Sequence, residues 1–132
     1  MKELEVVAAI IEYDNKILCM QRNVSKYAYT SLKYEFPGGK VESGETNPEA
    51  LERELREEMD MDVSITDKDY FMTIHHVYPD FAITMHAYTV NVDSPKFTRK
   101  EHINHEWLEV KDLKKLDWAA ADMPIVEKLI NG

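Results

Sequence analysis

The sequence has one cysteine, no long apolar run and a shortage of basic residues, and each shortage argues against a class of protein. With Cys19 alone, a disulfide framework is excluded, and a metal site built from several thiolates is disfavoured. Cys19 lies in the apolar run from Ile17 to Met20, so we expect a buried structural thiol rather than a reactive one.

No segment approaches the roughly 20 apolar residues that a membrane-spanning helix needs. The start of the chain, Met1 to Glu3 followed by the apolar run from Leu4 to Ile11, is too short and too acidic for a signal peptide. We therefore expect this segment to form a first strand. We also expect a cytoplasmic protein without a membrane partner.

The 16 basic residues are outnumbered by 25 acidic ones, which gives a formal net charge of −9. A protein that binds a nucleic-acid backbone presents a basic face, so a nucleic-acid partner is disfavoured. An acidic protein can nevertheless bind a small polyphosphate, provided that divalent cations lie between the two sets of negative charge.

The 132 residues show no repeat, low-complexity tract or linker, which predicts a single domain over 1–132. Segments 24–33 and 40–47 are expected to be loops, and a turn over 37–39 is expected to stop the strand before the second of them. The first helix is predicted over 48–59, with Asn47 as its cap and Pro48 in its first turn. A second helix is predicted over 124–130. Strands are predicted over 5–12, 16–23, 34–36, 63–65, 71–78, 81–92 and 106–110. The pattern is typical of an α+β fold, an α/β/α sandwich with a mixed central sheet.

The first predicted helix gathers carboxylates beside its apolar face. Each helical residue advances about 100°, so Glu54, Glu57 and Glu58 fall within an arc of roughly 100°. Leu51 and Met59 belong to an adjacent apolar stripe that can pack on a sheet. The carboxylates are therefore expected beside the buried edge of the helix, not opposite to it.

Like charges on one helix face repel, at a cost of roughly 0.2–0.5 kcal/mol for each exposed pair. A hard divalent cation such as magnesium or manganese reverses that penalty and can also hold a polyphosphate. The simpler interpretation of a glutamate-rich helix is a solvated face. The Gly38-Gly39 pair and Glu45 upstream favour a binding site, because glycine lets the backbone approach a ligand closely.

The stretch from Gly39 to Met61 resembles the Nudix box. This motif has fixed spacings between a glycine, a glutamate, an Arg-Glu pair, an aliphatic residue, a Glu-Glu pair, a glycine and a second aliphatic residue. The matching residues are Gly39, Glu45, Arg53, Glu54, Leu55, Glu57, Glu58 and Met61. So many fixed positions in one pattern make the resemblance specific.

One position departs from the motif, because Asp60 stands where the family has glycine. This position ends the helix, where a left-handed residue is common, and aspartate tolerates that conformation better than most residues. From the motif alone, Asp60→Gly is expected to stabilise the fold and to leave the activity intact.

Two other segments extend the resemblance to the MutT-like branch of the family, which removes damaged nucleotides from the nucleotide pool. They are Tyr34 to Lys40 and Trp118 to Val126. Among MutT-like enzymes the chain is most similar to CTP pyrophosphohydrolases and oxidised-nucleotide triphosphatases. The resemblance implies magnesium-dependent hydrolysis of a ribo- or deoxyribonucleoside triphosphate to the monophosphate and pyrophosphate. Two alternatives stay open: hydrolysis of ADP-ribose or a dinucleoside polyphosphate, and a nucleotide sensor without turnover.

The resemblance also implies the metal and catalytic residues. Glu54, Glu57 and Glu58, with a carbonyl of Gly38 or Gly39, would bind Mg²⁺ or, as a substitute, Mn²⁺. One of the box glutamates would instead deprotonate water, and the sequence does not say which. Arg53 would orient the glutamates, including Glu45, with an ordinary surface ion pair as its alternative. Glu101 matches a later-loop metal ligand, with a solvated loop charge as its alternative.

The substrate-binding residues implied by the resemblance come from four segments. Asp122 would read the base edge, because a carboxylate accepts from an exocyclic amino group such as cytosine N4; capping the last helix is its alternative. Arg22 would contact phosphate, or else lie on the surface at a strand end. The remaining candidates are Glu35, Phe36, Gly38, Lys40, His76, Tyr78 and Phe81. The five histidines form no zinc signature, and both a monomer and a homodimer remain open.

Overall fold

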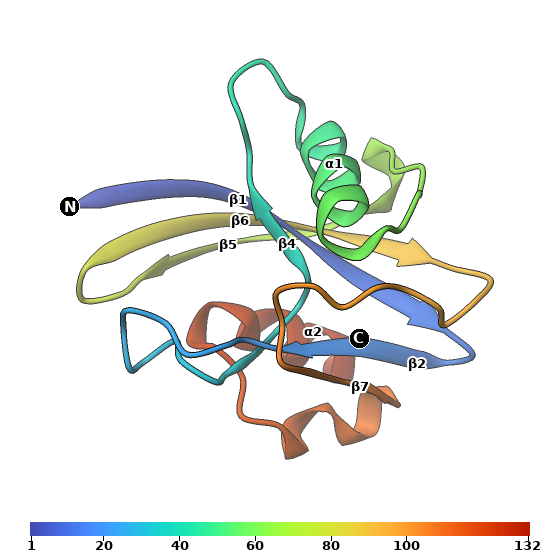
Figure 1. Cartoon of the computed structure of the whole chain (residues 1–132). Coiled ribbons are helices and arrows are strands. Elements are labelled where there is room, and N and C mark those ends of the chain that lie inside the picture. The colour runs from blue at the N-terminus through green and yellow to red at the C-terminus, as the bar shows by residue number, and fades with distance from the viewer.

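The computed structural model describes all of residues 1–132 as a mixed sheet with an α-helix on each face (Figure 1). Both α-helices lie close to their predicted positions, α1 over Asn47–Met59 and α2 over Met123–Asn131. Three short 3-10 helices that the sequence pattern did not predict cover Asp67–Asp69, Val110–Lys115 and Ala120–Asp122. The strands are β1 (Lys2–Tyr13), β2 (Lys16–Gln21), β3 (Tyr34–Glu35), β4 (Gly38–Lys40), β5 (Tyr70–Val77), β6 (Phe81–Asn91) and β7 (Asn104–Leu108).

The sheet is mixed, as predicted, because β1 pairs in parallel with β6 while the other pairings are antiparallel. The main strand order is β3-β2-β1-β6-β5, with β4 added to β1 and β7 added to β2. Along its other edge, β1 pairs first with β4 through Val6–Ala8 and then with β2 through Glu12 and Tyr13. The sheet therefore opens between β1 and β2, where β4 crosses toward the start of α1 (Figure 1).

Residues of β1 alternate between the two faces, as a strand buried on both sides requires. Val7, Ala9 and Ile11 face α1 and pack with its apolar stripe. The stripe consists of Leu51, Leu55 and Met59, all at most 1% exposed. Burying each of these three large side chains contributes about 1.5–3 kcal/mol. This packing fixes the rotation of α1 and hence the direction in which its glutamates point.

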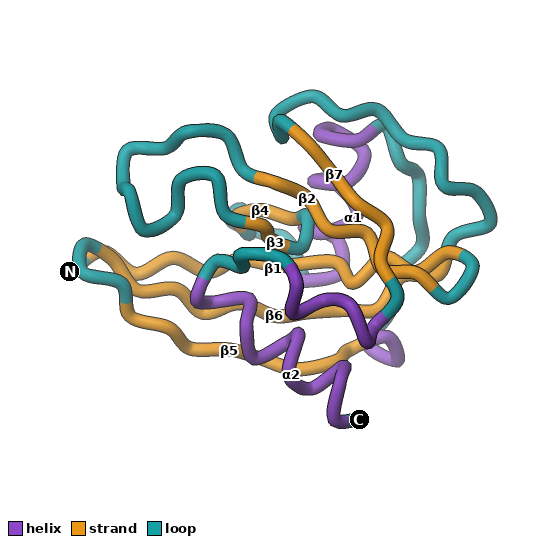
Figure 2. Tube along the Cα trace, turned by 90° about the horizontal axis from the view of Figure 1, so that it is seen from below, coloured by secondary structure: helices purple, strands orange, loops and turns teal.

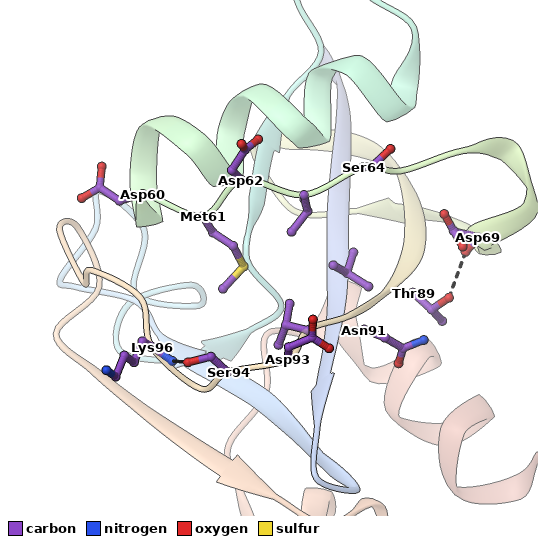
Figure 3. Close-up of a pocket in the computed structure, with 13 residues that line it drawn as sticks. Asp60, Met61, Asp62, Ser64, Asp69, Thr89, Asn91, Asp93, Ser94 and Lys96 are labelled. Atoms are coloured by element: carbon purple, nitrogen blue, oxygen red, sulfur yellow. Dashed lines mark hydrogen bonds between the residues drawn. The ribbon is translucent and has the colours of Figure 1, made fainter.

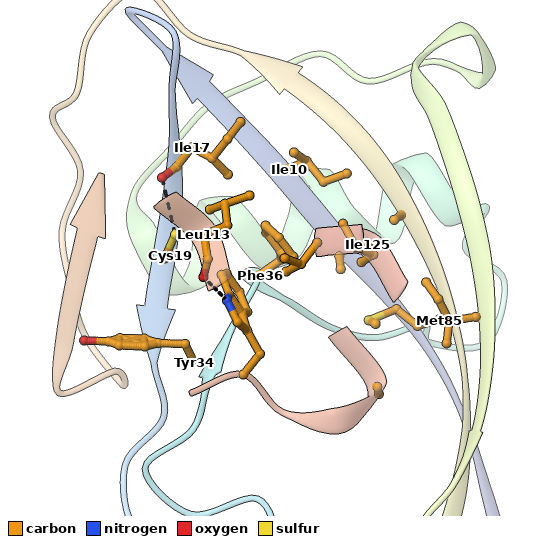
Figure 4. Packing of buried hydrophobic residues seen from close by; sticks show 14 of the residues in the cluster. Ile10, Ile17, Cys19, Tyr34, Phe36, Met85, Leu113 and Ile125 are labelled. Carbon is orange, nitrogen blue, oxygen red and sulfur yellow. Dashed lines mark hydrogen bonds between the residues drawn. The ribbon is translucent and has the colours of Figure 1, made fainter. Parts of the chain in front are cut away.

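Ala8 and Ile10 face the opposite side, where α2 packs beneath the sheet (Figures 2 and 4). Cys19 is fully buried in this core, which confirms the predicted structural thiol, and burial raises its pKa to about 12. Trp118 is buried there too, whereas Trp107 is only partly covered and lies edge-on to Tyr13. Neither α-helix has the length and apolar character needed to cross a membrane.

Several predicted boundaries are wrong. Gly38–Lys40 was predicted as a turn and loop but forms β4, because these residues pair with β1. Segment 63–65 is irregular instead of a strand, although Ile65 is still buried and its amide donates to Glu52. The last strand lies two residues earlier than predicted.

The cap of α1 is Thr46 rather than Asn47. Its hydroxyl accepts from the Glu49 amide, and the Glu49 carboxylate accepts from the Thr46 amide in return. This capping box is worth roughly 1 kcal/mol and fixes the first turn of the helix. Pro48 lies in that first turn, as predicted.

Candidate active site

Arg53 is the centre of an ion-pair network that joins α1 to the preceding loop. Its guanidinium donates to both carboxylate oxygens of Glu45, at 2.6 and 3.1 Å. It also donates to Glu54 and Glu57, each at 3.0 Å, and to the Lys40 carbonyl at 3.0 Å. With its side chain only 15% exposed, Arg53 is not the ordinary surface ion pair considered as its alternative. Its hydrogen bonds hold the pKa of Glu45 below the usual range.

Neighbouring atoms approach Gly38 and Gly39 closely, and at position 38, where these atoms belong to the backbone, glycine is required. A side chain at Gly38 would collide with the carbonyl of Val7 on the paired strand β1. A side chain at Gly39 would collide with the Glu54 carboxyl group. The glycine pair thus brings the backbone of β4 directly against a carboxylate of α1, as a shared ligand set requires.

Glu58 lies between two other carboxylates. Its half-buried side chain is within hydrogen-bonding reach of Glu54, one turn earlier on α1, and of Glu101, in the loop before β7. Burial, and then the negative charges of Glu54 and Glu101, raise the pKa of Glu58 to about 8. The structure therefore brings the later-loop glutamate chosen from the sequence into contact with the box glutamates.

The oxygen donors of this carboxylate cluster suit a hard divalent cation. Glu54, Glu58 and Glu101 offer only oxygen donors. The mutual repulsion of their carboxyl groups is the penalty that a cation removes. The side chains do not converge on one point as the ligands of a bound ion would. Glu57, the third box glutamate, points to Arg53 and is 59% exposed.

A cavity of about 310 Å³ opens over the carboxylate cluster. Its walls include Glu58 and Glu101, Gly38, and the strand-end residues Arg22 and Glu35. Glu35 accepts from Arg22 at 2.9 Å and is 2.8 Å from Nε2 of His102. The Nε atom of Arg22 is the only buried side-chain nitrogen or oxygen without a hydrogen-bond partner. Because this N–H group is buried, it can meet a ligand only if the Arg22 side chain shifts.

A second cavity, of about 270 Å³, shares Arg22, Glu35 and Gly38 with the first and continues between the sheet and the end of the chain. Its walls are largely apolar, and they include most of the residues that the resemblance assigned to the substrate. These are Arg22, Glu35, Phe36, Gly38, Lys40, Tyr78, Phe81 and Asp122. His76 does not line it but packs edge-on against Tyr78 with ring centroids 4.4 Å apart.

Asp122 is buried in the wall of this second cavity. It occupies the cap position of α2, but its carboxylate makes no capping hydrogen bond, so the capping alternative is wrong. One oxygen instead accepts from the Phe36 amide at 2.9 Å, which joins the end of the chain to the segment before β4. Burial, and then the nearby charge of Glu35, raise the pKa of Asp122 well above its ordinary value.

Two further aromatic rings pack against Tyr78 and Phe81, which line the second cavity. Tyr29 stacks on Tyr78 with ring centroids 5.2 Å apart, and Tyr27 packs on Phe81 with ring centroids 5.6 Å apart. Tyr29 also donates to Asp80 at 2.8 Å, which attaches the 24–33 loop to the β5–β6 turn. Sequence reasoning missed this role of the loop; two tyrosines in a polar segment were the available signal, but their partners lie about 50 residues away.

The largest cavity, of about 580 Å³, lies elsewhere (Figure 3). It is an open cleft between the segment after α1 and the end of β6, and its walls include Asp62, Asp69 and Asn91. None of the residues assigned to the metal or the substrate lines it. Size alone therefore does not identify the site, and the two smaller cavities, which hold the carboxylates and the aromatic rings, are the candidate active site.

Comparisons with known proteins find matches over nearly the whole chain. A family model described as NUDIX domain matches residues 6–128. The 8-oxo-dGTP diphosphatase of Escherichia coli (strain K12) is 34% identical over 131 residues, which cover 98% of each chain. The CTP pyrophosphohydrolase of the same strain is 35% identical over 127 residues, 96% of this chain and 91% of the relative.

A solved structure of a MutT protein of the Nudix hydrolase family, from methicillin-resistant Staphylococcus aureus 252, is 42% identical to this chain. It superimposes with a TM-score of 0.75 and covers 99% of this chain and 98% of its own. The fold, the matched length and the identity together confirm what the motif predicted. The chain belongs to the Nudix family and, within it, to the MutT-like hydrolases.

Proposed function

We propose that this chain hydrolyses a nucleoside triphosphate to the nucleoside monophosphate and pyrophosphate, with Mg²⁺ as its cofactor and Mn²⁺ as a substitute. One observation carries the proposal. The cavity over the carboxylate cluster and the aromatic-walled cavity adjoin each other, because Arg22, Glu35 and Gly38 line both. The first suits a metal-bound polyphosphate, and the second, with about 270 Å³, suits a base.

Glu54, Glu58 and Glu101, with a backbone carbonyl of Gly38 or Gly39, are the residues that would hold the metal. Glu57 would join them, since its exposed carboxylate can turn toward the cavity. Bound magnesium would neutralise the phosphate charges and polarise the phosphorus that water attacks. Glutamate in this cluster would accept the proton from that water.

The remaining groups orient the reactants. Arg53 holds Glu45 and Glu54 in place, so these two carboxylates keep one arrangement before substrate enters. Arg22 lines both cavities and would donate to a phosphate or sugar oxygen. Its Nη1 atom already donates to Glu35, which fixes the guanidinium at the junction of the two cavities.

The substrate class we favour is a cytosine nucleotide or an oxidised nucleotide. The two E. coli relatives support this choice, one named for CTP and the other for 8-oxo-dGTP. Asp122 is the residue we assign to the base edge, with Tyr78 and Phe36 in the walls around it. Because one Asp122 oxygen accepts from the Phe36 amide, the other is available to a donor on the base.

The proposal is tested by a substrate panel. The purified chain is incubated with Mg²⁺ and each common, methylated or oxidised nucleoside triphosphate, and with ADP-ribose, and products are separated by chromatography. We expect a monophosphate from a cytosine or oxidised nucleotide and no turnover in EDTA. Turnover of ADP-ribose alone would contradict the substrate class. Stabilisation by nucleotide without any product would contradict the enzymatic activity and favour a sensor.

Asp122→Asn is expected to change which nucleotide is preferred while the fold is retained. The asparagine carbonyl oxygen can still accept from the Phe36 amide, but the amide nitrogen now offers a donor where the carboxylate offered an acceptor. A single hydrogen bond to a charged group is worth roughly 1.5–3 kcal/mol, so KM for the best native substrate is expected to rise roughly tenfold or more. The kcat/KM values across the panel measure this effect, and an unchanged ranking with unchanged KM would remove Asp122 from base recognition.

A further inference from the structure

Residues 92–103, which join β6 to β7 and include Glu101, cap the C-terminal end of α1. The Thr98 amide donates to the Met59 carbonyl at 3.0 Å, and Lys100 Nζ donates to the Glu57 carbonyl at 3.0 Å. The last carbonyls of a helix lack partners within the helix, and a cation there also opposes the negative end of the helix dipole. This segment, the Glu101 loop, is thus attached to α1 immediately after the box glutamates.

Asp60 adds a third attachment. It adopts the left-handed conformation at the end of α1, with φ 52° and ψ 33°, as the motif predicted for this position. Its carboxylate is 2.9 Å from Lys100 Nζ, and Lys100, with Thr98 nearby, holds the pKa of Asp60 below its usual value. In Figure 3 Asp60 lies at the end of α1, at the rim of the large cleft. The glycine that the family has here can adopt the same backbone but offers no carboxylate to Lys100.

The other side of Glu101 is attached to the sheet. His102, only 8% exposed, is 2.8 Å from Glu35, and the Ile103 amide donates to the Gln21 carbonyl at 3.0 Å. Glu101 itself is exposed and has Glu58 as its neighbour. Its position therefore depends on Lys100 on one side and on His102 on the other.

We propose that Asp60, acting through Lys100, is a positioning residue that holds Glu101 against Glu58, ready to bind the divalent cation. The inference rests on the metal role of Glu101 in the proposed function. It also gives a reason for aspartate at a glycine position of the motif: one residue ends the helix and anchors the loop. The motif alone treats position 60 as a helix end, for which glycine serves equally well, and the Lys100 contact changes that expectation.

The ion pair between Lys100 and Asp60 is partly exposed, with 42% of the Lys100 side chain and 55% of the Asp60 side chain accessible. Its loss is therefore not expected to lower stability much. Glycine in place of a left-handed aspartate also relieves backbone strain, which acts in the opposite direction. We therefore expect Asp60→Gly to make the Glu101 loop less ordered and to weaken metal binding. The melting temperature is expected to equal or exceed that of the native protein.

Hydrogen–deuterium exchange without metal or nucleotide tests the attachment directly. In Asp60→Gly and Lys100→Met, amides from 98 to 103 are expected to exchange several-fold faster than in the native chain, while amides inside α1 are unchanged. Lys115→Met is the matched control, because it breaks another exposed ion pair, to Asp112 at 3.0 Å, outside the site. Unchanged exchange of the Glu101 loop in both variants would overturn the proposal.

Binding of Mn²⁺ alone, followed by calorimetry, tests whether the attachment positions Glu101. We expect roughly threefold to tenfold weaker binding in Asp60→Gly and Lys100→Met, native binding in Lys115→Met, and no further loss when the first two are combined. Native affinity in both variants despite faster loop exchange would also overturn it. Native affinity in Glu101→Gln would instead contradict the metal role in the proposed function, and loop exchange would still report the attachment separately.

Discussion

Glu58→Gln is expected to lower turnover by about a hundredfold or more while the protein stays folded. Glu58 contacts both Glu54 and Glu101, so it is the carboxylate most nearly surrounded by the others. Removing one group that stabilises developing charge typically costs about 10²–10³ in kcat. Glutamine keeps the shape of the side chain, and the raised pKa of Glu58 already leaves its carboxyl largely protonated near neutral pH without metal. The melting temperature without metal is therefore expected to stay nearly the same.

The control for this variant lies on the same helix. Glu52→Gln changes a carboxylate that accepts from the Ile65 amide, outside the carboxylate cluster, and glutamine can keep that bond. Near-native rates are expected for Glu52→Gln under the same conditions. The assignment of the metal and catalytic residues fails if Glu57→Gln and Glu58→Gln both turn over substrate at nearly the native rate.

Arg53→Lys is expected to produce the second largest loss, although it keeps the positive charge. The planar guanidinium contacts Glu45, Glu54, Glu57 and the Lys40 carbonyl at once, whereas a lysine ammonium is a single point that cannot reach all of them. Misplaced catalytic groups commonly cost about 10²-fold in rate. We therefore expect kcat to fall by about that factor, and the melting temperature to fall by several degrees as the 40–45 loop detaches from α1.

Arg56→Lys is the matched control, because Arg56 is exposed three residues further along α1. It is expected to leave both kcat and the melting temperature near their native values. A native kcat for Arg53→Lys would mean that the charge of Arg53 matters and its geometry does not, which contradicts the proposed orienting role.

The parts of the molecule that the sequence predicted well are those set by local patterns. The 3.6-residue period of α1 predicted which side chains face the sheet, and Leu51, Leu55 and Met59 are indeed buried. The same rotation places Glu54 and Glu58 at the edge of that face. The resemblance to the Nudix box implied that Arg53 orients Glu45, and the two side chains are in contact although eight residues separate them.

The features that the sequence did not predict depend on contacts between distant segments. Glycines suggested a turn at residues 38–40, but pairing with β1 makes this segment a strand. The Asp122 carboxylate binds the Phe36 amide, 86 residues away, instead of capping α2. Lys100 reaches Asp60 across 40 residues, and nothing local to either residue indicates the pair.

The central claim is that a metal-dependent carboxylate cluster cleaves a nucleoside triphosphate between its α- and β-phosphorus atoms. The measurement that tests it most directly is ³¹P NMR of the reaction with the best substrate of the panel, with Mg²⁺ and then with excess EDTA. The account predicts pyrophosphate and monophosphate in equal amounts with Mg²⁺, and neither with EDTA or in Glu58→Gln. A nucleoside diphosphate with inorganic phosphate, or the same products at the same rate in EDTA, would contradict the central claim.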